Sequence, residues 1–150
     1  GAEIREKYVK TGKVKMVYRD FAFLGPESTA SAEAAECAKD QGKFWGYHDA
    51  LYDIEIAEGN GGTVNSENSG NLNRSLFLKL AGDLGMDTAK FTSCIDSNKY
   101  ADVVKKSVAD AQGFDVNSTP SVFVGATKVL GAQPFDVFQK LIEKALGEAK

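Results

Sequence analysis

The chain has 150 residues, of which 43% are hydrophobic and 26% are charged, and its formal net charge is -3. This composition is typical of one globular domain with a real core, and the acidic balance gives no basic footprint of the kind that nucleic-acid binding requires. No apolar run approaches the roughly 20 residues that span a bilayer, and the first residues show no signal-peptide pattern.

The N-terminal residues are typical of the last turns of a helix. Ile4 and Tyr8 lie four residues apart, and Gly12 occupies the position where a glycine often ends a helix. From Lys13 to Phe21, apolar residues alternate with Lys and Arg, and this alternation predicts the first strand of the chain.

Residues 27–113 are predicted to form one helical block between two β-rich pieces. Apolar residues recur at helical spacing over 27–41, from 43 onward through 52, over 72–84, after Asp87 around Phe91, and over 100–113. His48 is the only histidine. Its place among aromatic residues favours a hydrogen-bonded core residue over a catalytic base or metal ligand.

The stretch from Glu58 to Asn71 is rich in Gly, Asn and Ser and has almost no apolar residues. This composition predicts an exposed loop. Its oxygen-bearing side chains leave a calcium site as the lesser alternative, because the EF-hand spacing is absent.

A hairpin led by a proline is predicted near the C-terminus. Pro120 directly precedes the β-forming run 121–124, and residues 125–127 form a loop before the second strand at 128–130. The Thr119-Pro120 bond is a candidate cis peptide, since only X–Pro bonds adopt cis at modest cost. A trans proline that starts an edge strand is the more frequent case. The final helix begins at Pro134.

The two cysteines, Cys37 and Cys94, are far apart and have neither a CxxC nor a metal-ligand spacing. From the residues alone, they are either two buried small apolar side chains or a structural disulfide. A disulfide would require an oxidising compartment.

Taken in order, these features resemble DsbA-like thiol-disulfide oxidoreductases, in which a helical domain is inserted into a thioredoxin fold. The resemblance covers essentially the whole chain. It rests on residues 12–21, Ala34-Ala35-Glu36-Cys37-Ala38, Gln41-Gly42-Lys43-Phe44-Trp45, His48-Asp49, 91–97 with Lys99-Tyr100, 113–116 leading into Ser118-Thr119-Pro120, and 131–135.

The resemblance implies an α/β, incomplete thioredoxin-like fold with a strand, an inserted helical block, a β-hairpin and a C-terminal helix. Residues 1–26 and 114–150 would form the partial thioredoxin core, and residues 27–113 the inserted helical domain. The strand missing from this order lies between residues 13–21 and the hairpin. The slot would be closed by movement of the two strands, by a second copy of the chain, or by a separate N-terminal piece.

The resemblance also assigns roles to individual residues. Thr119 and Pro120 would form a cis substrate-binding loop in which the backbone N–H and C=O of Thr119 pair with an extended peptide. Cys37 and Cys94 match positions in the helical domain, and a structural disulfide between them is implied.

The catalytic CxxC of this family does not occur in these residues. No catalytic residue is therefore assigned. We expect the motif upstream in a longer protein, together with the first strand and most of the redox helix. The chain alone is predicted to be redox-inactive, because thiol exchange needs a low-pKa thiolate and a resolving partner.

The expected function is that of a portion of a protein-disulfide oxidoreductase or isomerase. The alternative is a non-catalytic thioredoxin-like peptide-binding module. The resemblance implies unfolded or cysteine-containing proteins as partners, no cofactor and no metal, no nucleic acid, and a location outside the cytoplasm.

Overall fold

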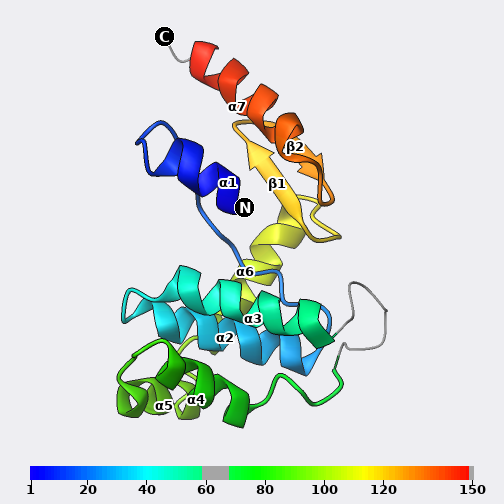
Figure 1. The fold of residues 1–150 in the computed structure, drawn as a ribbon. Coiled ribbons are helices and arrows are strands. Elements are labelled where there is room, and N and C mark those ends of the chain that lie inside the picture. The colour runs from blue at the N-terminus through cyan, green and yellow to red at the C-terminus, as the bar shows by residue number, and fades with distance from the viewer. Residues whose placement is uncertain (59–67, 149–150) are drawn as a thin grey trace. The chain divides into compact units, whose positions relative to one another are not determined.

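The computed structural model describes residues 1–58 and 68–148, which divide into two units (Figure 1). The hairpin unit comprises residues 1–19 and 111–150, and the helical unit comprises residues 20–110. The divisions predicted from the sequence, after residues 26 and 113, stay a prediction. Residues 59–67, which make up most of the predicted loop 58–71 and its alternative calcium site, lie outside the described residues.

The hairpin unit is built around a buried tyrosine. Helix α1 (Ala2–Ile4) continues as the π-helix η1 (Arg5–Val9), which ends near Gly12 at a φ of 72°. Tyr8 is fully buried against Phe138 and Ile142 of α7 (Phe135–Glu148). Its hydroxyl donates to Glu143 Oε1 at 2.7 Å, so the N-terminal helix is fixed to the C-terminal one.

The predicted hairpin and C-terminal helix are confirmed. Strand β1 (Ser121–Val124) pairs antiparallel with β2 (Thr127–Leu130), and Val122 lies opposite Val129. Both valines pack against the Tyr8 cluster. In Figure 1 the two arrows lie beside α7, which covers one face of the hairpin.

The strand predicted over residues 13–21 is wrong. Residues 13–23 form no helix or strand. Lys13 N and Val14 N donate to the carbonyl of Tyr8, and Phe23 N donates to the carbonyl of Phe21. The predicted alternation is nevertheless present over 13–19, where Val14, Met16 and Tyr18 are partly buried. A strand also needs a neighbouring strand, and within the described residues β1 pairs only with β2. A second copy of the chain in this position stays a prediction.

The helical unit contains the predicted helices. They are α2 (Pro26–Lys39), α3 (Phe44–Glu58), α4 (Arg74–Asp83), α5 (Thr88–Asp96) and α6 (Ala101–Gly113), whose last turn belongs to the hairpin unit. Alanines on α2, among them Ala34 and Ala38 with no exposed surface, let α3 approach closely, and Figure 1 shows these two helices side by side. Phe91 of α5 is also fully buried in this core.

Helix ends in this unit follow the sequence signals. The predicted N-cap Asp87 accepts a hydrogen bond from Lys90 N at 3.0 Å, which satisfies a free N–H of the first turn of α5. Gly85 has a φ of 66°, a conformation that glycine adopts without a steric penalty, just after α4.

Tyr47 of α3 is fully buried, and its hydroxyl donates to the carbonyl oxygen of Phe77 at 3.1 Å. Tyr47→Phe removes that donor, so the Phe77 carbonyl in α4 loses its side-chain hydrogen bond. We expect the free energy of unfolding to fall by about 1 kcal/mol in urea titrations followed by Trp45 fluorescence. Tyr52→Phe is the control, because Tyr52 is 54% exposed. Equal unfolding midpoints for the two variants would contradict this role.

Candidate functional site

The loop before β1 is anchored at both ends. Ser121 Oγ donates to the carbonyl of Ser118 at 2.8 Å, and Gly131 N donates to the carbonyl of Pro120 at 2.9 Å. Farther back, Lys128 Nζ donates to the carbonyl of Asp115 at 2.6 Å. The hairpin therefore holds the loop in place through backbone carbonyls on either side of Thr119.

Thr119 lies at the exposed tip of this loop. The Thr119-Pro120 peptide bond is cis, and both residues are exposed. Across the part of the chain that the structure describes, neither the N–H nor the C=O of Thr119 has a hydrogen-bond partner. An exposed peptide group with both positions free can pair with another extended chain.

Exposed aromatic side chains occur in the same unit. Phe114 is 70% exposed and Phe123 of β1 is 48% exposed, and their ring centroids are 6.5 Å apart. Lys128 Nζ lies 5.9 Å from the centre of the Phe123 ring. Together these three side chains give the hairpin unit an apolar surface with one cation at its edge.

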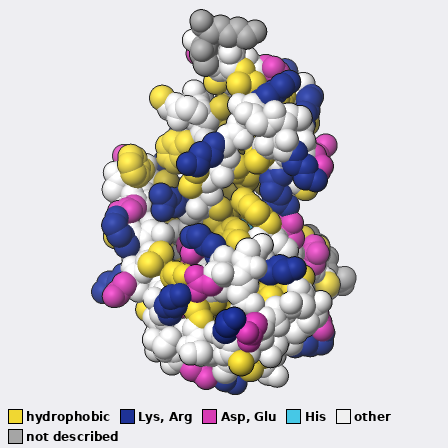
Figure 2. Space-filling view, turned by 90° about the vertical axis from the view of Figure 1, so that its left-hand side faces the viewer, with side chains coloured by type: hydrophobic (Ala, Val, Ile, Leu, Met, Phe, Trp, Pro, Cys, Tyr) yellow, Lys and Arg dark blue, Asp and Glu magenta, His cyan; other side chains and the backbone are white. Residues whose placement is uncertain are grey.

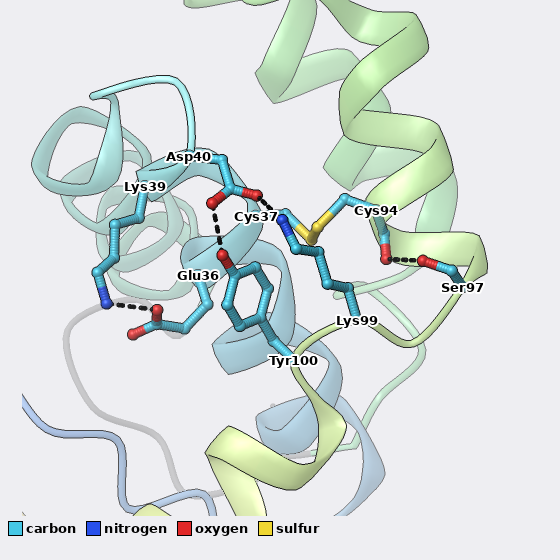
Figure 3. Close-up of polar contacts among 8 residues, drawn as sticks. All are labelled: Glu36, Cys37, Lys39, Asp40, Cys94, Ser97, Lys99 and Tyr100. Carbon is cyan, nitrogen blue, oxygen red and sulfur yellow. Dashed lines mark hydrogen bonds and ion pairs between the residues drawn. A yellow bond between two sulfur atoms is a disulfide. The ribbon is translucent and has the colours of Figure 1, made fainter.

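Cys37 and Cys94 form a disulfide that joins α2 to α5, with 5.9 Å between their Cα atoms (Figure 3). Only 2% of Cys37 and 8% of Cys94 is exposed. Both cysteines belong to the core of the helical unit. The implied disulfide is therefore present and crosslinks two core helices.

A polar network lies beside the disulfide, at the end of α2. Lys99 Nζ is 2.6 Å from Asp40 Oδ2, and the Tyr100 hydroxyl donates to Asp40 Oδ1 (Figure 3). The hydrogen bond from Lys99, followed by that from Tyr100, lowers the pKa of Asp40, and the bond to Asp40 raises the pKa of Tyr100. The network ties the segment before α6 to α2.

Two buried carboxyl groups were missed from sequence. Asp20 is 5% exposed and Glu36 is 7% exposed. Burial, and then the charge of Glu36, raise the pKa of Asp20 to about 6. Lys39 Nζ lies 2.7 Å from Glu36 Oε2 and opposes the shift at Asp20. The one available sequence signal was the run of apolar residues that begins at Phe21.

His48 is packed as predicted. Its side chain is 17% exposed, and its Nδ1 lies 2.9 Å from Asp49 Oδ1. The centroids of the His48 and Tyr52 rings are 4.7 Å apart. Among residues 1–58 and 68–148, no group of three His, Cys, Asp or Glu side chains could hold a metal ion. Nor does that part of the chain contain a helix long and apolar enough to cross a membrane.

The surface carries charges of both signs. On the face drawn in Figure 2, the described Lys and Arg side chains are interspersed with Asp and Glu. This distribution agrees with the formal net charge of -3.

Comparisons with known proteins place the chain in a family. A family model described as thioredoxin matches residues 1–144. The chain is 28% identical over 147 residues to the "Probable disulfide bond formation protein D" of Bacillus anthracis, which covers 95% of this chain and 63% of the relative. It is 26% identical over 147 residues to the protein of the same name from Bacillus cereus, with the same coverage.

A solved structure agrees with these sequence matches. It is a thioredoxin-like oxidoreductase from Silicibacter pomeroyi DSS-3, with a TM-score of 0.72 and 28% sequence identity. The match covers 96% of this chain and 75% of that one, whereas the chain spans 63% of the length of the two Bacillus relatives. Because the family model matches nearly every residue, this chain belongs to the thioredoxin family.

Proposed function

We propose that this chain is the substrate-loop and helical-domain portion of a DsbA-like protein-disulfide oxidoreductase or isomerase. The observation that carries the proposal is the exposed Thr119 peptide group, whose N–H and C=O have no partner among the described residues. Its partners are unfolded or cysteine-containing proteins that bind as extended chains. The Bacillus relatives, named for disulfide bond formation, support this class of substrate.

The proposal includes a location outside the cytoplasm. The Cys37–Cys94 disulfide supports it, because such bonds persist in oxidising compartments and are rare in the cytosol.

Backbone pairing at Thr119 is tested with a short extended peptide that carries serine in place of cysteine. N-methylation of its central residue removes a backbone donor, and we expect binding to weaken by roughly threefold to tenfold. N-methylation of the first residue is the matched control. Thr119→Ala keeps both backbone groups and should lose less affinity than central N-methylation. Equal affinity for both methylated peptides would contradict pairing at this loop.

The chain alone is proposed to be redox-inactive towards protein substrates. Its two cysteines are bonded to each other and almost fully buried, so no thiolate and resolving pair is available for turnover. We expect the chain to leave the rate of insulin disulfide reduction by dithiothreitol unchanged. Acceleration in proportion to the concentration of the chain would contradict this.

The alternative function is a non-catalytic peptide-binding module, and the same cysteine arrangement favours it. Peptide binding is common to both functions, so it does not separate them. The gene sequence upstream of the Gly1 codon does: an encoded CxxC favours the oxidoreductase, and a start codon or signal cleavage site favours the module.

A further inference from the structure

A hollow of about 340 Å³ lies in the helical unit at the Cys37–Cys94 disulfide. Both cysteines line it, together with the polar residues Gln41, Ser93 and Ser97. Its charged lining consists of two ammonium groups, Lys90 and Lys99, and one carboxylate, Asp40. The lining of the hollow therefore places two ammonium groups and one carboxylate beside a sulfur–sulfur bond.

The two ammonium groups are held in place and remain accessible to water. Lys99 Nζ lies 2.6 Å from Asp40 Oδ2, and its side chain is 52% exposed. Lys90 Nζ lies 3.3 Å from Asp87 Oδ2, and its side chain is 79% exposed. Figure 3 shows the Lys99 side chain running past the disulfide towards Asp40. Both ammonium groups line the hollow and attract an anion that enters it.

Positive charge at this position has a chemical consequence. Cys37 and Cys94 lie in the last turns of α2 and α5, where the partial negative charge of the helix end disfavours a thiolate. Ammonium groups oppose that effect. They also attract an anionic attacking thiol, whose thiolate form is the nucleophile in disulfide exchange.

We propose that this hollow is a thiol-exchange site that selects small anionic thiols, such as thiols carrying a carboxylate or sulfonate. This role is separate from the proposed substrate loop. It is a stoichiometric reaction of the Cys37–Cys94 bond and not a catalytic cycle on protein substrates.

The exchange begins at the more exposed cysteine residue. Cys94 is 8% exposed and Cys37 is 2% exposed, so a thiolate RS⁻ attacks Sγ of Cys94. An R–S–Sγ bond forms, the bond to Cys37 breaks, and its electron pair leaves on Cys37 Sγ. A second RS⁻ attacks the sulfur of the bound R group and releases Cys94 as a thiolate with RSSR. Two thiols are thereby oxidised to one disulfide, and the protein disulfide gains two electrons and two protons.

Three two-carbon thiols of different charge test the site: 2-mercaptoethanesulfonate, 2-mercaptoethanol and 2-mercaptoethylamine. Each is incubated with the folded 150-residue chain. The cysteines that reduction releases are then alkylated and counted by intact mass. Each rate of disulfide reduction is divided by the concentration of the thiolate form of the probe. We expect the anionic probe to react about threefold to tenfold faster than the neutral one, and the cationic probe to react slowest. About 1 M salt should remove most of the difference in rate between the three probes.

Charge-removing variants locate the effect. Lys90→Gln and Lys99→Gln should each reduce the preference for the anionic probe, and Lys99→Arg should keep it. Lys79→Gln is the control, since Lys79 is exposed and pairs with Asp83 on α4. The proposal is overturned if the folded chain resists all three probes, if their rates are equal or in the opposite order, or if Lys79→Gln changes the preference as much as the other two.

Discussion

Reduction of the Cys37–Cys94 disulfide is expected to lower the free energy of unfolding of the helical unit by about 2–4 kcal/mol. The bond closes a sequence separation of 57 residues, so its loss gives the unfolded chain considerable conformational freedom. It also joins α2 to α5 inside the core. Trp45, the single tryptophan, lies in the helical unit and reports its unfolding in urea with and without reductant.

The matched control for this experiment is the double variant Cys37→Ala/Cys94→Ala. It has no disulfide, so reductant should leave its unfolding midpoint unchanged. If reductant leaves the midpoint of the native chain unchanged as well, while alkylation shows that the bond has opened, the stabilising role assigned to the disulfide is incorrect.

Asp20→Asn is expected to stabilise the helical unit by about 2–3 kcal/mol near pH 7.5. Burial raises the pKa of Asp20 from 3.8 to about 6, so its ionised form is less favourable in the folded chain than in the unfolded chain. The folded state binds more protons between these values, and stability falls as pH rises through that window. An asparagine removes the charge and retains most of the shape.

The pH dependence separates this effect from a simple packing change. Near pH 4 the folded carboxyl is already protonated, so the gain from Asp20→Asn should fall below about 1 kcal/mol. Asp83→Asn is the control, because the Asp83 side chain is 55% exposed on α4. A gain from Asp20→Asn of the same size at both pH values, or destabilisation near pH 7.5, would contradict the assigned cause.

Local sequence signals predicted the helices well. The Asp87 cap and the glycine at 85 mark the start of α5 and the end of α4, because these residue types satisfy or release specific backbone groups at helix ends. The hairpin followed from Pro120 and the β-branched run after it. These features depend on residues within a few positions of one another, which a single sequence displays directly.

Features that depend on distant contacts were not predictable from local pattern. The alternation over 13–21 correctly indicated which side chains are partly buried over 13–19, but not whether another strand pairs with that segment. The burial of Asp20 and Glu36 is decided by the packing around α2. Local sequence likewise favoured a trans Thr119-Pro120 bond and left the cysteine pairing open, and both expectations changed only with the family resemblance.

The proposed role of the Thr119-Pro120 loop is tested most directly by amide-resolved NMR during titration with the serine-containing extended peptide. We expect the Thr119 amide signal and its neighbours in the loop and β1 to shift in a saturable way, while signals of the exposed face of α4 around Lys79 stay in place. Saturable binding that leaves the Thr119 amide unchanged, or no binding at all, would contradict it.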